Sequence, residues 1–337
     1  MNSRLFSICI LTLGVLAWGV VYSQSRPNVV LILADDMGYG DLGCYGGTTI
    51  PTPHIDALAR GGMRFTDFHS NGVVCSPTRA ALLTGRYQQR AGVPEVITVD
   101  PKYDELGLPL SETTLAEVVK KAGYDTAIFG KWHLGYQKRY NPTYQGFDAF
   151  RGYVSGNVDY QSHLDAPGRA DWWSGAHLED EPGYVTDLVT KHGVEFIERH
   201  RDRPFLLYLA HESPHYPYQG PDDPAFRKPN GKNQSQGPRQ DVETAYREMI
   251  VSLDEGVGRV VAALKKAGLE KSTLIIFCSD NGPTGPGLAG PLRGRKGTTW
   301  EGGHRVPGIF YWPGRIAAGL VTDETALTMD ILPTVAA

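Results

Sequence analysis

The sequence predicts an α/β fold in which helices flank a doubly wound, mostly parallel sheet. Four apolar runs rich in β-branched residues have the composition of buried strands. They open the segments 28–36, 125–133, 205–215 and 273–281. Helical patterns stand between these runs. They cover the segments 53–60, 114–122, 185–199 and 242–267. Strands that alternate with helices along a chain are typical of a parallel sheet covered by helices.

The residue sequences of the four runs support their assignment as buried strands. In chain order they read NVVLILADD, DTAIFGKWH, FLLYLAHESPH and TLIIFCSDN. Each has consecutive apolar residues at or near its start, as expected for a strand buried on both faces of a sheet, and each ends in polar residues. The segments 140–182 and 219–240 are long and rich in Gly, Pro, Asn and aromatic residues, so we expect loops that form a substrate-facing rim.

Size and charge restrict the class of protein. The chain has 337 residues and 41% hydrophobic residues, which is enough for a large core or for two packed subdomains. Its 33 basic and 37 acidic residues give a net charge of −4, so no overall basic field attracts nucleic acid. We therefore expect no nucleic-acid partner, and any recognition of an anion must be local.

Residues 1–24 have the pattern of a secretory signal peptide. Arg4 precedes an apolar run over residues 5–22, and small polar residues follow it. An uncleaved membrane anchor is the alternative, because the run approaches the roughly 20 residues that span a bilayer. We expect residues 25–337 to form the mature catalytic domain of a secreted or periplasmic protein.

The chain has four cysteines, and one of them needs a chemical explanation. Cys9 lies in the predicted signal peptide, which leaves an odd number in the mature chain. An odd cysteine in an exported protein indicates a free thiol, an intermolecular pair or a residue used in chemistry. Cys44 and Cys278 could pair with each other or remain buried thiols. Cys75 is the candidate for a chemical role.

Cys75 stands immediately before a predicted helix start. Ser76 is a good N-cap, Pro77 suits the first helical position, and Gly85 can end the helix. Unpaired amide groups and the positive end of the helix dipole favour an anion at such a start, and Arg79 adds charge in the first turn. The segment therefore predicts an oxyanion site.

Acidic and amide side chains end the first and fourth apolar runs. Asp35 and Asp36 end the first, and Asp280 and Asn281 end the fourth. Ligands of open α/β sheets bind beyond the carboxyl ends of the strands, so these four residues should converge. Three carboxylates and an amide carbonyl are typical ligands of a hard cation, with Ca²⁺ favoured over Mg²⁺ in an exported protein. Alternatively, each pair forms a turn or caps the next helix.

Positively charged side chains and imidazoles form a second set of candidate site residues, beside the acidic and amide side chains. They are Arg79, Lys131, His133, His215 and Lys296. Together they could hold a tetrahedral anion and polarise it for displacement at its central atom. Taken singly, each could instead be a surface or capping residue, and the glycine-rich basic loop 292–303 could simply be solvated.

Several blocks of this chain resemble those of the type I sulfatases. The letters CSPTR at 75–79 match the Cys-x-Pro-x-Arg signature of that family, and AALLTGRY after them resembles its extended motif. Other similar blocks occur in family order from about residue 28 to the end. They are NVVLILADDMGYGDLGCYG, TAIFGKWHLG, SPHYP, SDNG and GRKGTTWEGG. The chain thus resembles the arylsulfatase and N-acetylgalactosamine sulfatase branch, which implies an alkaline-phosphatase-like sheet.

The resemblance also implies a mechanism that explains Cys75. In such sulfatases a separate maturation enzyme oxidises this cysteine to Cα-formylglycine, an aldehyde whose hydrate attacks sulfur. The metal ligands for Ca²⁺ would then be Asp35, Asp36, Cys75, Asp280 and Asn281. The resemblance implies that Arg79 holds the formylglycine, while Lys131 and Lys296 bind sulfate oxygens. His133 would take a proton in the elimination of sulfate, and His215 would protonate the leaving alcohol.

The resemblance leaves the substrate and the end of the chain open. Residues 152–163 resemble the N-acetylgalactosamine sulfatase branch, and three aromatic residues nearby could stack on a sugar or pack in the loop core. They are Tyr160, Trp172 and Trp173. A sulfated carbohydrate is favoured over an aryl sulfate. Family members usually continue into a C-terminal antiparallel subdomain, so the end at Ala337 is expected to reflect truncation.

Two other functions remain alternatives at this point. A phosphoester or phosphonate hydrolase could use the same metal-bearing scaffold, because phosphate and sulfate groups are both tetrahedral. A sulfoglycan-binding protein without turnover would result if Cys75 were never matured.

Overall fold

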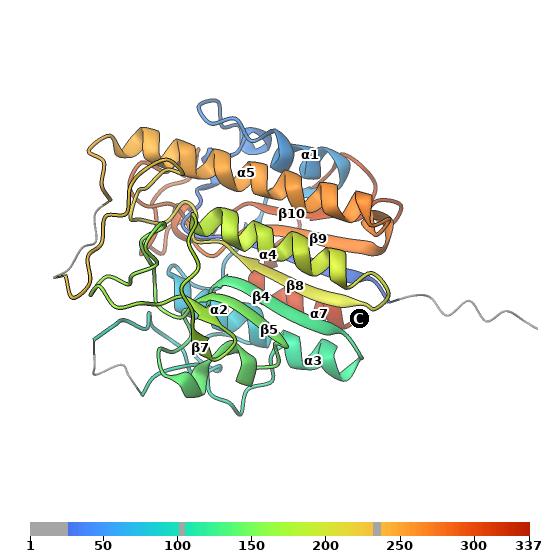
Figure 1. Ribbon diagram of the computed structural model, residues 1–337. Helices are drawn as coiled ribbons and strands as arrows, with labels where there is room; N and C mark the ends of the chain where they lie inside the picture. The colour runs from blue at the N-terminus through green and yellow to red at the C-terminus, as the bar shows by residue number, and fades with distance from the viewer. Residues whose placement is uncertain (1–25, 101–104, 232–236) are drawn as a thin grey trace, which may run out of the picture.

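A computed structural model describes residues 26–100, 105–231 and 237–337 of the chain. Among these residues, ten strands form one sheet with helices on both faces, which confirms the predicted fold class (Figure 1). The order of the strands is β11-β2-β10-β9-β1-β8-β4-β5-β6-β7. Five central strands, from β9 to β5, run parallel to one another.

The four predicted strands lie side by side at the centre of the sheet. They are β1 (Asn28–Ala34), β4 (Asp125–Lys131), β8 (Phe205–Ala210) and β9 (Thr273–Ser279). The remaining strands of the sheet are β2 (Met63–Phe65), β5 (Ala149–Tyr153), β6 (Trp173–Ser174), β7 (His177–Leu178), β10 (Gly308–Tyr311) and β11 (Leu320–Thr322). A separate pair consists of β3 (Phe68–His69) and β12 (Ala326–Leu327).

Helices cover the two faces of the sheet as separate layers. One layer holds α1 (Pro53–Gly61), α4 (Val185–Arg199) and α5 (Val242–Lys266), and the other holds α2 (Cys75–Thr84), α3 (Leu115–Lys121) and α7 (Ile331–Ala336) (Figure 1). The short helix α6 (Glu301–His304) lies outside these layers. Side chains of β1 alternate between the layers, because successive residues of a strand point to opposite faces. Ile32 packs in the first core and Leu31 in the second.

The register of the central strands aligns their carboxyl ends. Leu33 of β1 pairs with Ala210 of β8 and with Cys278 of β9, and Gly130 of β4 also pairs with Ala210. The residues that follow these positions therefore leave the sheet at one edge. This register puts the polar ends of four separate segments next to each other.

The sheet differs from the predicted one at its margins. The expectation of a loop over 140–182 is wrong in part, because this segment contains β5, β6 and β7. The strand β5 reads AFRGY and lacks an apolar run, yet it pairs along β4. Pairing with an existing strand edge satisfies its backbone groups, and local sequence does not report such a partner. Likewise, β10 pairs antiparallel with β9 and was not predicted.

The two cysteines that could have paired are free thiols on opposite sides of the sheet. Cys44 packs against the core under α1, α4 and α5, whereas Cys278 lies in the core under α2, α3 and α7. The sheet therefore separates the two sulfur atoms.

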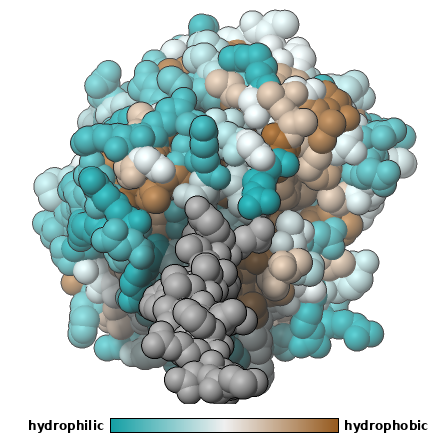
Figure 2. Space-filling model, turned by 90° about the vertical axis from the view of Figure 1, so that its right-hand side faces the viewer, coloured by the Kyte–Doolittle hydropathy of each residue, from teal (hydrophilic) through white to brown (hydrophobic). Residues whose placement is uncertain are grey.

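The predicted signal peptide at 1–24 lies outside the described residues. Within the described ranges, every helix is too short or too polar to cross a bilayer. The face on the right of Figure 1 carries mainly hydrophilic side chains, and its apolar ones form scattered patches (Figure 2).

Gly130 provides a test of the central register. Its φ is +105°, and a Cβ there would lie 2.0 Å from the Ala210 carbonyl oxygen, so β4 and β8 would have to separate. Gly268 has a φ of +73° with no atom within 4 Å of such a Cβ. We expect Gly268→Ala to cost about 1 to 2 kcal/mol from backbone strain alone. Gly130→Ala should cost a further 1 to 3 kcal/mol or so from the clash.

Urea denaturation of both variants measures this difference. Equal losses of unfolding free energy would contradict the close approach of β4 and β8 at Gly130.

Candidate active site

The helix α2 begins at Cys75, two residues before the predicted first helical residue, Pro77. Val74 is the N-cap, so the prediction of Ser76 as the cap is wrong. Instead, the Ser76 hydroxyl accepts a hydrogen bond of 3.1 Å from the amide of Ile97, which fixes a neighbouring loop. Gly85 ends the helix in the left-handed conformation, as predicted, with a φ of 63°. The Cys75 side chain therefore projects from the first turn, where unpaired amides favour an anion.

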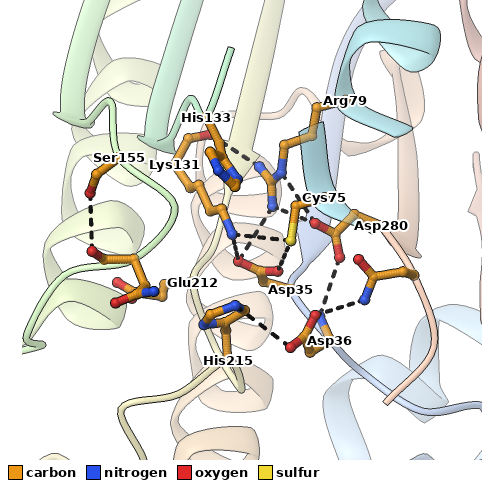
Figure 3. Close-up of polar contacts among 12 residues, drawn as sticks. Asp35, Asp36, Cys75, Arg79, Lys131, His133, Ser155, Glu212, His215 and Asp280 are labelled. Carbon is orange, nitrogen blue, oxygen red and sulfur yellow. Dashed lines mark hydrogen bonds and ion pairs between the residues drawn. The ribbon is translucent and has the colours of Figure 1, made fainter. Parts of the chain in front are cut away.

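Charged groups surround the Cys75 sulfur. The ammonium group of Lys131 lies 3.4 Å from Sγ, and the thiol lies 3.4 Å from Oδ1 of Asp35 (Figure 3). The Lys296 ammonium lies 3.2 Å from Sγ. Burial raises the pKa of the Cys75 thiol to about 12, and Asp280 and Asp35 raise it further than the two lysines lower it. The thiol is therefore neutral near pH 7, whereas a cysteine nucleophile requires a lowered pKa.

Arg79 connects several segments of the site through hydrogen bonds. Its Nε and Nη2 donate to Oδ2 of Asp280 at 3.2 and 2.9 Å, and its Nη1 donates to the Lys131 carbonyl at 3.1 Å. Its Nη2 also lies 3.6 Å from Oδ2 of Asp35. Burial alone would lower the pKa of Arg79, but Asp280 and the other anions raise it well above its usual range. The guanidinium thus remains charged, and it joins three segments of the site.

Asp36 accepts several hydrogen bonds from side chains of the site. It has a φ of 63°, in the left-handed region that few residues other than glycine adopt. It accepts hydrogen bonds from Asn281 Nδ2 at 2.7 Å, from Thr284 Oγ1 at 2.9 Å and from the Lys296 ammonium. Burial opposes ionisation of Asp36, but the charges of Lys296 and His215 outweigh it and lower its pKa. Asp36 is therefore a buried carboxylate.

The oxygen-rich part of this cluster has the composition of a hard-cation site. One donor atom from each of four residues lies within 4.8 Å of the others; they are Asp35, Asp36, Cys75 and His215. The amide oxygen of Asn281 is buried and has no hydrogen-bond partner among the described residues. A buried acceptor without a donor is costly, and a cation would satisfy it. The oxygens of Asp35, Asp36 and Asn281 therefore fit Ca²⁺.

Asp280 is shared between Arg79 and the backbone. Its Oδ2 accepts from Arg79, and its Oδ1 accepts from the amide of Asp36 at 3.2 Å. Burial and the nearby Asp35 carboxylate raise the pKa of Asp280. A cation beside these oxygens would offset that repulsion.

A cavity of about 320 Å³ opens above the cysteine. Four of the predicted residues line it, and they are Cys75, His133, His215 and Lys296. Other walls come from the segment 96–99 and from Ser155, Gly156 and Asn157, which belong to the predicted substrate-facing rim. The cavity is thus bounded by charged groups at its base and by loops at its mouth. A larger hollow of about 630 Å³ lies elsewhere, between α4 and the β4–β5 margin.

The hydrogen bonds of the two histidines determine their tautomers. His133 Nε2 lies 2.8 Å from the Ile97 carbonyl and must donate, so its Nδ1 carries the lone pair. This Nδ1 is buried with no partner among the described residues. Burial, together with Lys131 and Arg79, holds the pKa of His133 well below its usual value. His133 is therefore a neutral proton acceptor.

His215 has the opposite arrangement. Its Nδ1 donates to the Tyr216 carbonyl at 2.5 Å, and its Nε2 lies 3.7 Å from Oδ2 of Asp36. Burial lowers the pKa of His215 well below its usual value, although Asp36 raises it in part. Its Nε2 thus points into the cluster.

The structure brings nine of the predicted site residues into one contact network and puts the tenth, His133, on the cavity wall. The nine are Asp35, Asp36, Cys75, Arg79, Lys131, His215, Asp280, Asn281 and Lys296. Sequence reasoning missed two contributors, Thr284 and the Ile97 carbonyl. Thr284 lies three residues after Asn281 and could have been found by that proximity, but a backbone carbonyl carries no sequence signal.

The three aromatic residues that could stack on a sugar differ in their burial. Tyr160 is fully buried and stacks on Tyr184 with ring centroids 5.2 Å apart. Trp172 is also buried and stacks on His163 at 4.6 Å. Both belong to the loop core, so neither can face a sugar. Trp173 is half-buried and donates its indole N–H to Asp171.

Comparisons with known proteins identify the family to which this chain belongs. A family model described as Sulfatase matches residues 27–337. Arylsulfatase A from Homo sapiens is 39% identical over 339 residues, which cover 92% of this chain and 64% of the human protein. N-acetylgalactosamine-6-sulfatase from Mus musculus is 36% identical over 348 residues, which cover 96% of this chain and 64% of the mouse protein. The chain thus spans 64% of the length of these curated relatives.

Solved structures are similar in fold as well. The crystal structure of Ps i-CgsB in complex with k-i-k-neocarrahexaose has a TM-score of 0.83 and 32% identity, covering 93% of this chain and 71% of that one. A phosphonate monoester hydrolase of Agrobacterium radiobacter has a TM-score of 0.62, covering 92% of this chain and 73% of that one. Its identity of 22% indicates likeness of fold alone.

Arg79 allows a test of the buried charge network. We expect Arg79→Met to destabilise the fold by about 3 to 5 kcal/mol, because it leaves buried carboxylates without their cation. Arg259→Met removes an exposed pair with Asp187 and should cost at most about 1 kcal/mol. Urea denaturation in the presence of a chelator measures both. Equal small losses would mean that the site tolerates an unpaired carboxylate.

Proposed function

Because the chain belongs to the sulfatase family, we propose that it hydrolyses sulfate esters at the cavity above Cys75. The observation that carries the proposal is the position of Cys75 at a helix start, between two lysine ammoniums and beside a carboxylate cluster. An anion fits there because amides, helix dipole and ammoniums all favour negative charge. The relatives named as sulfatases support the same reaction.

We propose that a separate maturation enzyme oxidises Cys75 to Cα-formylglycine. The modification supplies an oxygen nucleophile, as the hydrate of an aldehyde, in place of the thiol. The neutral, buried state of the thiol supports this assignment, because such a thiol is a weak nucleophile. Arg79 lies one turn further along α2 and would hold the modified side chain in position.

The lysines and histidines of the cavity have the chemistry that sulfate transfer needs. Lys131 and Lys296 would bind sulfate oxygens, because each ammonium already lies within 3.4 Å of the sulfur atom of Cys75. His133 would accept a proton at Nδ1, which carries its lone pair. His215 would donate a proton from Nε2 to the leaving alcohol. Burial keeps this imidazole neutral in the free site, so the role requires that the bound anionic ester raises its pKa.

We propose that Asp35, Asp36, Asp280 and Asn281 hold Ca²⁺ together with the modified residue 75. The ion supplies positive charge that polarises the bound sulfate. Three carboxylates and three cations balance one another in the cluster, so a dication would leave an excess of positive charge for the anionic ester. The cations are Arg79, Lys131 and Lys296.

A sulfated carbohydrate is the substrate class that we favour, with an aryl sulfate as the alternative. One relative is named for a sulfated-sugar activity, N-acetylgalactosamine-6-sulfatase, and one similar structure holds a neocarrahexaose. The polar loop residues Ser155 and Asn157 at the cavity mouth could hydrogen-bond sugar hydroxyls. We also propose export to the periplasm or the exterior, with residues 25–337 as the catalytic domain.

The mass of the peptide containing residue 75 tests maturation. Protein made in a host with the maturation enzyme should lose about 18 Da there, because sulfur and two hydrogens are replaced by one oxygen. The peptides containing Cys44 and Cys278 should keep their thiol masses. An unmodified Cys75 in fully active protein would contradict the formylglycine mechanism.

Turnover of paired substrates tests the reaction. Matured protein should hydrolyse a sulfate ester faster than the matching phosphate ester, and Cys75→Ala should lose at least about a thousandfold in kcat/KM because the nucleophile is absent. Cys44→Ala removes a thiol outside the cavity and should retain turnover. A preference for the phosphate ester would favour a phosphoester hydrolase, and binding of a sulfoglycan without turnover by matured protein would favour a binding protein.

Calcium should stabilise the fold through the proposed ligands. At a hundredfold excess over Kd, a cation that binds only the folded state adds about 2.7 kcal/mol. The Tm of the wild type should therefore be higher in Ca²⁺ than in chelator, and Asp36→Asn and Asp280→Asn should lose most of that difference. Asp254→Asn alters a buried carboxylate that caps α1 and should keep it. An unchanged Tm of the wild type would remove the metal assignment.

A further inference from the structure

A second cluster of metal-ligating side chains lies outside the cavity above Cys75. One donor atom from each of His69, Glu301 and His304 lies within 4.8 Å of the other two. His69 and His304 also line a separate hollow of about 440 Å³. The sulfate-ester chemistry proposed above uses none of these side chains.

Backbone pairing holds the two histidines side by side. The amide of Ser70 donates to the His304 carbonyl at 2.8 Å, and the amide of Val306 donates to the Phe68 carbonyl at 2.9 Å. These two hydrogen bonds flank His69 and join segments more than 200 residues apart. These bonds fix the backbones of the two histidines relative to each other. Their Nδ1 atoms lie 2.9 Å apart.

A carboxylate orients one of these imidazoles as a ligand. His69 Nε2 lies 3.0 Å from Oδ1 of Asp67 and must donate to it, so His69 Nδ1 presents its lone pair to His304. Asp67 is held in turn by Thr325, whose hydroxyl donates to Oδ2, and by Arg305 at 3.4 Å. A histidine whose second nitrogen donates to a carboxylate is the usual arrangement of a metal-ligating histidine.

Glu301 supplies a third donor from the same short helix as His304. The two residues are three apart in α6, so their side chains lie on one side of it. Glu301 is exposed, and Arg305 lies 3.2 Å from its Oε2. The carboxylate can therefore turn toward the imidazoles at little cost.

We propose that His69, His304 and Glu301 form a second metal site, for Zn²⁺ or a similar divalent transition metal. Two imidazoles and one carboxylate suit this class of metal, whereas Ca²⁺ prefers oxygen ligands alone. Three protein ligands leave a fourth position for water, and the hollow beside the histidines provides room for it.

A metal at this site would connect two segments that contribute residues to the cavity above Cys75. His69 precedes Cys75 by six residues, and Glu301 follows Lys296 by five. The amide of Gly297 already donates to the Val73 carbonyl at 2.9 Å, which ties the same two segments closer to the cysteine. The metal would add a second tie between the segment that carries Cys75 and the loop that carries Lys296.

Zinc binding to the full chain tests this site. Metal-stripped protein in saturating Ca²⁺ is titrated with Zn²⁺, and Co²⁺ serves as a spectroscopic probe of the ligands. The wild type should bind one equivalent, with a rise in Tm and a Co²⁺ spectrum typical of nitrogen and oxygen ligands. His69→Ala and His304→Ala should each weaken binding by at least about 100-fold, and Asp67→Asn by about 10- to 100-fold.

Matched variants separate this site from the cluster at Cys75. His177→Ala removes an exposed histidine of β7, and Cys75→Ala removes the only sulfur donor of the first cluster, so both should retain the zinc equivalent. Retention of the Ca²⁺-dependent rise in Tm shows that the histidine variants are folded. Zinc binding that survives in the double variant of His69→Ala and His304→Ala, or that disappears in Cys75→Ala, would overturn the proposal. The histidines would then form a hydrogen bond only.

Discussion

The burial of three carboxylates at one edge of the sheet is the constraint on which the rest of the site depends. Asp35, Asp36 and Asp280 are fully buried, and a buried carboxylate is tolerated only with a partner charge and hydrogen bonds. Arg79 and Lys131 are buried with them, and Lys296 covers them from a loop. The charges of the two sets balance, so neither set could be buried without the other.

This constraint explains why such distant segments meet where they do. Asp35 and Asp280 leave neighbouring parallel strands at the same level, because Ala34 pairs with Ser279. Their mutual repulsion is offset by Arg79, which comes from a helix on one face of the sheet. The guanidinium also holds the carbonyl of Lys131, so one side chain sets the positions of three strands' ends relative to the cysteine.

The same arrangement favours an oxygen nucleophile at position 75 over a cysteine thiolate. A thiol beside carboxylates in a buried place keeps its proton, so the environment of Cys75 is unsuited to a thiolate. It suits an anionic ester, because ammonium groups and helix amides surround the cavity base. The second cluster, at His69 and His304, has a different ligand chemistry. Its two imidazoles would hold the loops that frame the cavity, and the oxygen-rich cluster forms the base of the cavity.

The sequence alone determined four of the five central parallel strands, the main helices and the residues that gather around Cys75. The helix predicted at 185–199 has the observed bounds, since the periodicity of its apolar residues is a local property. Only the tertiary structure decided the start of α2 at Cys75, the tautomer of His133 and the burial of Tyr160. It also decided the pairing of β5 with β4 and the meeting of His69 with His304. Each of these depends on contacts between segments far apart in the chain, and local residue patterns do not encode which distant backbone supplies the partner.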